Sequence, residues 1–418
     1  MSKIKNIKSR QVFDSRGFPT VEAEVILEDG SIGSAIVPSG ASTGTHEAHE
    51  LRDVNEKYLN KSVLNAVENI REKILPALKT RSAYDQREID KKMIELDGTL
   101  NKSSLGANAI LAVSIANCKA AAISQKKEIY AYLSKTQKYT LPYPMLNIIN
   151  GGAHANNSLQ IQEFMIRPDS AKSFSECMQM SFLVIQKLKK LLNQKKLSTS
   201  VGDEGGFAPS LDSDQHALDF IIQAIEKSGF VPGKDFNLCL DVAANEIYDG
   251  KVYSIENNIK TEPMDMISYY EKLASKYPIK SIEDPIFEDD WGTWKKLTEK
   301  IGDKVQIVGD DLFVTNSVRL QKGIENKSAN AILIKVNQIG SVTETIDTIE
   351  LAQQNSFNTI ISHRSGDTED TFIADLAVAT NSSQIKTGSL ARSERVSKYN
   401  RLLRIEDSNT ETISMAKI

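Results

Sequence analysis

The last two thirds of the chain alternate short apolar segments with longer stretches of helical periodicity, and this alternation restricts the fold more than any other feature. Six mainly apolar segments stand out, at residues 238–240, 279–282, 305–308, 331–334, 359–361 and 384–385. Strands that alternate with helices build parallel βα units. Because so many units follow one another, they favour a closed barrel. We therefore predict an α/β barrel of the TIM type.

The first third of the chain has a different pattern. Apolar side chains alternate with mainly polar ones over residues 20–27, and an Asp-Gly pair then provides a hairpin turn into a second strand over residues 31–37. Apolar residues recur three and four apart over residues 63–78, which predicts a helix. A second helix is expected to begin after Asp85 as its N-cap, and an alanine-rich third helix to cover about residues 107–124. Strands followed by helices indicate an α+β domain.

The boundary between these two patterns contains two prolines. Pro142 and Pro144 lie within residues 141–144, and proline prevents a helix from continuing. We interpret this segment as a linker. The expected domains are an N-terminal α+β capping domain, residues 1–135, and a C-terminal catalytic α/β barrel, residues 136–418.

Composition excludes several classes of function. The formal net charge is -4, so no basic footprint for nucleic acid is expected. Residues 1–11 contain no apolar core of a secretory signal, and the most apolar stretch, residues 109–123, is interrupted by polar side chains and is expected to fall short of a membrane span. The cysteines are odd in number and widely spaced, at Cys118, Cys177 and Cys239. They predict neither a disulfide framework nor a zinc site, and the expected location is the cytoplasm.

Each of the six apolar segments leads into a residue with a reactive side chain. These residues are Asp241, Glu283, Asp310, Lys335, His363 and Lys386, which follow one another at intervals of 42, 27, 25, 28 and 23 residues. The last four intervals suit one βα unit each, and the first leaves room for an insertion. Because the carboxyl ends of barrel strands meet at one face, these side chains are expected to converge on one site.

The chemistry of this set favours a metal-assisted carbon acid reaction. The first three members are carboxylates, and oxygen ligands of this kind suit magnesium better than zinc or copper. Lys335 is then expected to lie near a cation, which disfavours its ammonium form and leaves the amine free to act as a base. The lysine would remove a proton from a carbon next to a carboxylate while the metal stabilises the enolate.

Each residue taken alone also has an ordinary structural interpretation. A single acid such as Asp241 at a strand end is often a helix cap, Lys335 a solvated or paired lysine, and His363 a half-buried histidine. Six such endings in successive units favour the shared site instead.

Longer motifs in the chain resemble those of enolases. They are residues 38–44 (PSGASTG), 147–152 (NIINGG), 162–165 (QEFM), 202–206 (GDEGG), 281–284 (SIED), 335–340 (KVNQIG), 362–366 (SHRSG) and 384–388 (QIKTG). The likeness runs from near residue 14 to near residue 405 and therefore covers almost the whole chain. Long motifs in a fixed order are far more specific than one short pattern.

This resemblance implies a fold, a reaction and a set of metal ligands. The barrel is expected to depart from strict βα alternation in its opening strands. The reaction is expected to be the glycolytic, magnesium-dependent, reversible dehydration of 2-phosphoglycerate to phosphoenolpyruvate. Asp241, Glu283 and Asp310 would bind one magnesium ion. A second ion, which arrives with substrate, would be bound by Ser42 in the loop of residues 40–44.

The resemblance also implies catalytic roles. Lys335 would take the proton from C2, a pairing of lysine and magnesium that is the known pattern of this superfamily and not an independent prediction. Glu204 would protonate the departing C3 hydroxyl, with help from Glu163, since two neighbouring carboxyl groups raise one pKa. The implied substrate contacts are Lys386 to the carboxylate, Arg364 and Ser365 to the phosphate, and His154, Gln162, Glu163 and His363 around them. One departure lies at residues 244–245, Ala-Asn, where a serine is expected; it replaces no assigned ligand.

Two alternatives stay open at this stage. The first is a dehydratase or racemase of the same superfamily that acts on unphosphorylated acids, although it would leave Glu204 and Arg364 without a purpose. The second is a binding role, with a secondary cell-surface or secreted pool, through the lysine-rich stretch of residues 172–197. That stretch, whose expected apolar face includes Phe182, is more simply a barrel helix with a solvated basic face. As in enolases, a homodimer or homo-octamer is expected.

Overall fold

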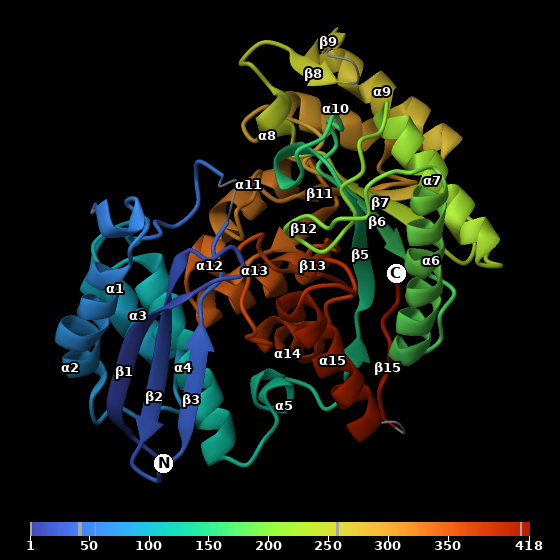
Figure 1. Ribbon diagram of the computed structural model, residues 1–418. Coiled ribbons are helices and arrows are strands. Elements are labelled where there is room, and N and C mark those ends of the chain that lie inside the picture. The colour runs from blue at the N-terminus through green and yellow to red at the C-terminus, as the bar shows by residue number, and fades with distance from the viewer. Residues whose placement is uncertain (1, 41–43, 55, 256–258, 410–411) are drawn as a thin grey trace.

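The computed structural model describes residues 2–40, 44–54, 56–255, 259–409 and 412–418. Its N-terminal part begins with an antiparallel sheet of three strands in the order β1-β2-β3, drawn in blue in Figure 1. These strands are β1 (Ile4–Phe13), β2 (Pro19–Leu27) and β3 (Ile32–Ile36). The alternation predicted over residues 20–27 is confirmed, since Val21, Ala23, Val25 and Leu27 are all buried on one face of the sheet.

The helices predicted for the N-terminal part are also confirmed. Residues 64–78 form one continuous helical segment with a π-helical centre, and the next helix has Asp85 as its N-cap, whose carboxylate accepts a hydrogen bond from Glu88 N at 3.2 Å. The elements are a 3-10 turn (Glu56–Tyr58), α1 (Leu64–Asn69), the π-helix (Ile70–Ile74), α2 (Leu75–Leu78), α3 (Gln86–Asp97), α4 (Ala107–Ser124) and α5 (Ile129–Leu133).

Helix α4 is the centre of the N-terminal part. It packs on β2 and β3 with one side and on the barrel helices α12 (Val336–Ile339) and α13 (Val342–Gln354) with another. Gly33 of β3 allows the closest approach, because a Cβ atom there would lie 2.2 Å from Ala116 O. Among the described residues, α4 is the one helix long and apolar enough to cross a membrane, with a mean hydropathy of 1.3, but 83% of it is buried inside the protein.

The second part is a closed barrel of eight strands, β5-β6-β7-β10-β11-β12-β13-β14. Strand β6 runs antiparallel to both of its neighbours and the others pair in parallel, which confirms the expected departure from strict alternation. The strands are β5 (Tyr143–Asn150), β6 (Glu163–Arg167), β7 (Asn237–Asp241), β10 (Ile279–Glu283), β11 (Gln306–Gly309), β12 (Ala331–Ile334), β13 (Asn358–Ser362) and β14 (Gln384–Lys386). Five of the six predicted apolar segments lie within these strands, and the segment 305–308 begins one residue before β11.

Helices surround the barrel (Figure 1). They are α6 (Phe174–Gln194), α7 (Asp214–Lys227), α9 (Pro263–Lys276), α10 (Trp291–Ile301), α11 (Ser317–Asn326), α12 (Val336–Ile339), α13 (Val342–Gln354), α14 (Phe372–Ala379) and α15 (Ser393–Ser408), and a 3-10 turn (Gly152–His154) follows β5. The barrel interior is filled by Met145, Met165, Cys239, Val308, Ala331, Leu333 and Ile360.

The insertion expected between the first two strand endings is present. Between β7 and β10 the chain forms the short helix α8 (Ala244–Ile247) and a hairpin of β8 (Tyr253–Ile255) and β9 (Ile259–Thr261) before α9.

The linker predicted at residues 141–144 is wrong, because this segment lies in strands. Thr140–Leu141 form β4, which pairs with β15 (Ser414–Met415) near the C-terminus, and β5 begins at Tyr143.

Pro144 fits within β5 because its missing N–H faces an unpaired edge. Tyr143 N donates to Ser383 O on the β14 side at 2.9 Å. The nitrogen of the next residue therefore points to the β6 side, where pairing with β5 begins only at Leu146.

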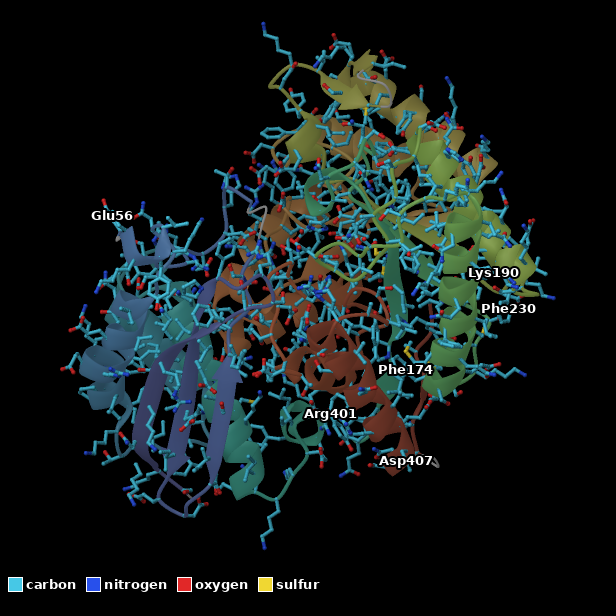
Figure 2. The ribbon with its side chains drawn as sticks, in the orientation of Figure 1. Glu56, Phe174, Lys190, Phe230, Arg401 and Asp407 are labelled. Carbon is cyan, nitrogen blue, oxygen red and sulfur yellow. The ribbon has the colours of Figure 1, made fainter. Side chains whose placement is uncertain are left out.

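Helix α6 confirms the barrel-helix interpretation of the lysine-rich stretch, with one correction. Phe174 is buried at its start and Lys190 is exposed, as Figure 2 shows. Phe182, expected on the apolar face, is 52% exposed. The buried face follows Ser181, Val184 and Ile185 instead, so Phe182 falls beyond its edge.

Candidate active site

The polar residues predicted at the strand ends converge at one end of the barrel. Lys386 on β14 connects three strands: its Nζ lies 2.9 Å from Asp241 Oδ2, 2.9 Å from Glu283 Oε2 and 3.1 Å from Glu163 Oε1. Asp310, Lys335 and His363 directly follow β11, β12 and β13. One pocket is lined by described members of the predicted set: His154, Gln162, Glu163, Glu204, Asp241, Asp310, Lys335, His363, Arg364, Ser365 and Lys386.

Glu163 reaches this site because its strand is reversed. It is the first residue of β6, and it pairs with Asp241, the last residue of β7. In an antiparallel pair the start of one strand meets the end of the other. A strand that runs against the rest of the barrel thus contributes its N-terminal residue to the face where the other strands end.

Lys335 differs from the neutral amine predicted by its sequence position. Its Nζ donates a hydrogen bond to Asp310 Oδ2, and Asp310 Oδ1 accepts a second one from Gln338 Nε2 at 2.9 Å. Burial lowers the pKa of Lys335, but the neighbouring carboxylates, of which Asp310 contributes most, together raise it by a larger amount. The net pKa therefore lies above the ordinary value. The carboxylates alone therefore favour the ammonium form.

A second group combines two buried acids with a histidine. His154 Nδ1 lies 3.7 Å from Glu163 Oε1 and 3.7 Å from Glu204 Oε1. Burial raises the pKa of Glu163, and the neighbouring Glu204 raises it further, to well above the ordinary value. Burial also opposes the ionisation of Glu204, but His363 and His154 lower the pKa of Glu204 below the ordinary value. The two pKa shifts thus have opposite directions, upward for Glu163 and downward for Glu204, the reverse of what the assignment of Glu204 as acid suggests.

The donor set at the strand ends suits a divalent cation. Asp241, Glu283 and Asp310 offer only carboxylate oxygens, the donors that magnesium prefers. Burial raises the pKa of Glu283, and the adjacent Asp241 and Asp310 add to the rise. Lys386 and Lys335 are the ammonium groups that contact these acids. Further positive charge would relieve the repulsion among the oxygens, so the residues fit a metal ion.

Glu47 connects Arg364 to Gly44, the last residue of the loop of residues 40–44. Arg364 Nη1 donates to Glu47 Oε2 at 2.9 Å and Arg364 Nη2 to Glu47 Oε1 at 3.2 Å. The same Oε1 accepts from Gly44 N at 3.0 Å. One carboxylate therefore links the predicted phosphate-binding arginine to the last residue of the loop.

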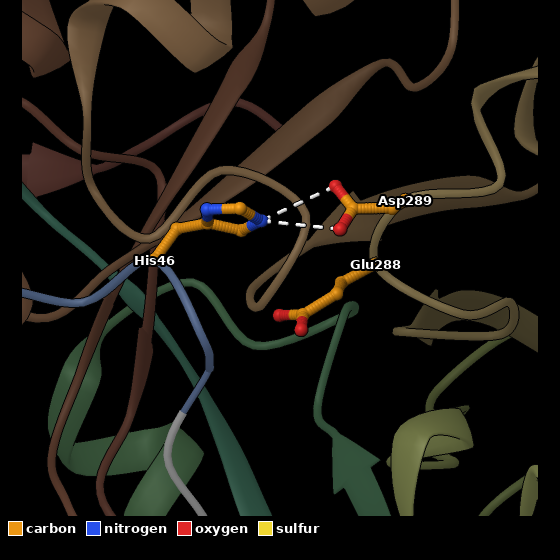
Figure 3. A group of neighbouring side chains, drawn as sticks. All are labelled: His46, Glu288 and Asp289. Carbon is orange, nitrogen blue, oxygen red and sulfur yellow. Dashed lines mark hydrogen bonds and ion pairs between the residues drawn. The ribbon is translucent and has the colours of Figure 1, made fainter.

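The loop of residues 40–44 is anchored to the barrel beyond its end. His46 Nε2 lies 3.2 and 3.1 Å from the two carboxylate oxygens of Asp289, as Figure 3 shows, and Thr45 Oγ1 donates to Glu288 Oε1 at 2.6 Å. At the other end, Ser39 N donates to Gly366 O at 2.7 Å. Ser42, the expected ligand of a second ion, lies outside the described residues.

Several residues of the site were not predicted from the sequence. Asp284 and Asp311, which were not predicted, form a second acidic group with the predicted Asp310. Burial, together with Asp310, raises the pKa of Asp311 to about 8. Asn147 Nδ2 donates to Glu204 Oε2 at 3.1 Å. The acid doublets at 283–284 and 310–311 were a signal in the sequence, whereas no pattern indicated Asn147.

Asn245 lies in the segment where a serine was expected. It connects this second acidic group to Glu288, which binds Thr45. Its Nδ2 donates to Asp311 Oδ2 at 2.9 Å, and its Oδ1 accepts from Glu288 N at 3.0 Å. A serine is too short to make both contacts in this way.

A larger cavity of about 500 Å³ has a different lining. It is lined by Arg16, Arg52 and Lys61 and by residues that flank the loop, and by none of the predicted site residues that the structure describes. The strand-end pocket is therefore the candidate active site.

Comparisons with known proteins identify the family of the chain. The family model described as "Enolase, N-terminal domain" matches residues 4–133, and the one described as "Enolase, C-terminal TIM barrel domain" matches residues 138–417. A curated protein named "Enolase" from Pelagibacter ubique is 59% identical over 419 residues, which covers 100% of both chains. Another "Enolase", from Corynebacterium kroppenstedtii, is 56% identical over 409 residues, 97% of this chain and 96% of that relative.

Proposed function

The chain belongs to the enolase family, and we propose how its own residues divide the work of that family's reaction. It is a glycolytic enolase, a hydro-lyase that converts 2-phosphoglycerate to phosphoenolpyruvate with a divalent metal. The identity of the metal, the roles of individual residues and the assembly are our proposals.

We assign proton abstraction to Lys335. Its nitrogen removes the proton from C2, and its contact with Asp310 controls whether that nitrogen carries a proton beforehand. We propose magnesium as the metal, two ions per site, with Asp241, Glu283 and Asp310 as ligands of the first and Ser42 of the second, which arrives with substrate. When bound, the metal would stabilise the negative charge that develops on the substrate carboxylate.

We assign departure of the C3 hydroxyl to the acid pair. Glu204 gives a proton to the leaving oxygen, which departs as water while the C3–O bond breaks. Because Glu163 is the member of the pair with the raised pKa, we assign it the proton in the resting site. It supplies this proton to Glu204, and His154 lies beside both acids. The two acids thus act as one donor.

Substrate binding uses groups that open onto the same pocket. Lys386 holds the substrate carboxylate, and Arg364 with Ser365 holds the phosphate, a task that suits a planar guanidinium. Among the buried side-chain atoms of the described chain, His154 Nδ1, Gln162 Oε1, Glu163 Oε2 and His363 Nε2 lack a hydrogen-bond partner. They are available to substrate hydroxyl, carboxylate and water.

The observation that carries this proposal is the placement of a buried lysine–aspartate pair and a buried acid pair in one pocket. A base and an acid that serve different bonds predict separable defects. Lys335→Ala should abolish exchange of the C2 proton with solvent, whereas Glu204→Gln should retain exchange and lose dehydration. Proton exchange is followed by NMR in deuterated water, and dehydration by absorbance of phosphoenolpyruvate.

The exposed Lys190→Ala serves as the matched lysine control and should behave as the wild type. Equal loss of exchange in Lys335→Ala and Glu204→Gln would show that the two roles are not divided in this way. Turnover of an unphosphorylated sugar acid in preference to 2-phosphoglycerate would favour the alternative member of the superfamily.

The metal assignment has its own test. A chelator should remove activity and added magnesium should restore it. Magnesium should also raise the thermal midpoint, because an ion that binds only the native state at about 100 times its Kd adds about 2.7 kcal/mol. Asp310→Ala should lose most of both effects. Magnesium-stimulated turnover in Asp310→Ala would remove this residue from the ligand set.

We further propose a cytoplasmic homodimer or homo-octamer. The support is the family alone, and sedimentation velocity of the purified chain distinguishes these states from a monomer.

A further inference from the structure

Arg395 of α15 is a fully buried arginine that contacts three segments of the candidate site. Its side chain is 0% exposed. Nη1 donates to Arg364 O at 2.6 Å, and Nη2 donates to Ser365 O at 2.6 Å and to Asp203 O at 3.1 Å. The guanidinium therefore holds both the phosphate-binding segment and the segment that leads into Glu204, although no proposed step uses Arg395.

Gly388 allows this arginine to pass. It has a φ of +72°, and a Cβ atom there would lie 2.5 Å from Glu204 O and 3.0 Å from Arg395 Cδ. Ser389 N also donates to Glu204 O at 2.9 Å. The backbone of Glu204 and the stem of Arg395 are thus packed against the same glycine.

The contact between Arg395 and His363 determines where the histidine carries its proton. Arg395 Nη1 lies 2.5 Å from His363 Nδ1. A guanidinium can only donate, and it stays charged at all relevant pH values. His363 Nδ1 must therefore accept, which leaves the ring proton of the neutral imidazole on Nε2.

His363 Nε2 faces the reaction site. It lies 3.3 Å from Glu204 Oε2, without the alignment of a hydrogen bond, and it lacks another partner among the described residues. Both residues line the pocket. An N–H in this position can donate to the Glu204 carboxylate or to an oxygen beside it.

Burial, more than the neighbouring charges, keeps His363 neutral. Burial lowers its pKa, Glu204 and Asp367 oppose the effect, Arg395 adds to it, and the resulting pKa is about 4. The imidazole near pH 7 is then a donor of fixed polarity and not a second acid.

We propose that Arg395 is a positioning residue that holds His363 as its Nε2–H tautomer and thereby presents an N–H to Glu204 and to the oxygen that leaves the substrate. The same guanidinium orients the backbone of the phosphate-binding segment. The benefit to catalysis rests on the proposed function, but the tautomer itself does not.

The tautomer can be measured without turnover. The chain has five histidines, so ¹⁵N-histidine labelling gives a short set of ring signals, and that of His363 is identified by its loss in His363→Gln. We expect protonated Nε2 and unprotonated Nδ1 near pH 7, and a coupling across the hydrogen bond between Arg395 Nη1 and His363 Nδ1. A Nδ1–H tautomer, or a mixture, in the wild type would overturn the proposal.

Variants of α15 test the cause. Arg395→Lys keeps the charge but cannot contact the ring and the three carbonyls together, so His363 should become a mixture of tautomers and kcat should fall about 10- to 100-fold. The matched control is Lys398→Met, which removes another buried cation of α15 that binds Asp367 at 2.7 Å and not His363. In Lys398→Met the tautomer of His363 should stay unchanged.

A single Nε2–H tautomer in folded Arg395→Lys would show that Arg395 does not set it. If Arg395→Lys does not fold, the coupling in the wild type decides, because its absence refutes the contact. The proposed function fails by the separate route of C2 exchange in Lys335→Ala, which does not depend on the state of His363.

Discussion

At the scale of single residues, the protein buries many ionisable groups, and their neighbours decide which of them carry charge. Lys386 is 2% exposed; burial lowers its pKa, but Asp241, Glu163 and Glu283 raise it well above the ordinary value. Asp284, by contrast, has other acids around it, and burial with Asp311 and Asp310 raises its pKa. The sign of the neighbouring charge, and not burial alone, separates the two outcomes.

Asp90 predicts a pH dependence outside the active site. It accepts hydrogen bonds from Thr343 N at 2.9 Å and Thr343 Oγ1 at 2.6 Å, and burial nevertheless raises its pKa to about 6. The folded state therefore binds this proton more tightly than the unfolded state, whose pKa is near 3.8. The contribution to stability is full below about pH 3.8 and is lost as the pH rises through about 6.

Comparison with Asp90→Asn isolates this contribution. The free energy of unfolding of the wild type, relative to that of the variant, should fall by about 2 kcal/mol between pH 4 and pH 7. Urea unfolding at a series of pH values measures it. Parallel curves for the two proteins would mean that Asp90 has an ordinary pKa.

At the scale of elements, two pairings between distant segments bring the site residues together. The reversal of β6 brings Glu163 to the end of β7, and the pairing of Ser39 with Gly366 holds the residue before Gly40 at the segment that carries Arg364. Neither is a property of one element, since each depends on a partner strand or segment far away in the chain.

The packing of β3 on α4 predicts a strong effect of one methyl group. Gly33→Ala would place Cβ 2.2 Å from both Ala116 O and Ala120 N, which are backbone atoms that cannot turn away. The strand must move off the helix, at a cost of about 1–3 kcal/mol or more. The thermal midpoint should fall clearly.

Gly292→Ala is the matched control. It lies near the start of α10, where the nearest atom to an added Cβ is Asp290 Oδ1 at 3.7 Å. Alanine is the better helix former, so the midpoint should stay the same or rise slightly. Equal losses in both variants would contradict the close packing of β3 on α4.

At the scale of the whole molecule, the N-terminal part and the barrel are joined by ion pairs of unequal burial. Lys119 of α4 contacts Asp370 at 2.7 Å, with side chains 14% and 10% exposed. Arg87 of α3 contacts Asp347, with side chains 57% and 43% exposed. The first pair also fixes β3, since Asp370 Oδ2 accepts from Ile36 N at 3.2 Å.

These two pairs should differ in their contribution to stability. Lys119→Met leaves the carboxylate of Asp370 without its ammonium partner, which should cost about 1–3 kcal/mol. Arg87→Met removes an exposed pair and should cost less than about 1 kcal/mol. Thermal midpoints of the two variants give the comparison, and a larger loss in Arg87→Met would contradict it.

The sequence by itself determined most of the barrel strands and which of the residues at their ends share one face. Apolar runs of strand length ended at Asp241, Glu283, Asp310, Lys335, His363 and Lys386, and a parallel barrel brings such ends together wherever its helices lie. Helix α4 and the cap at Asp85 were equally local, because periodicity and capping depend on neighbours within a few residues.

Only the tertiary structure decided the electrostatic environment of the site residues and which other residues hold them in place. Glu163 and Glu204 have opposite pKa shifts, Lys335 is paired with Asp310, and Arg395 contacts His363, because each of these features depends on groups tens to hundreds of residues away in the chain. Pro144 lies inside a strand for the same reason: the neighbouring strand begins to pair only beyond it. Electrostatic and hydrogen-bonding partners act through space, and no local pattern in the chain records them.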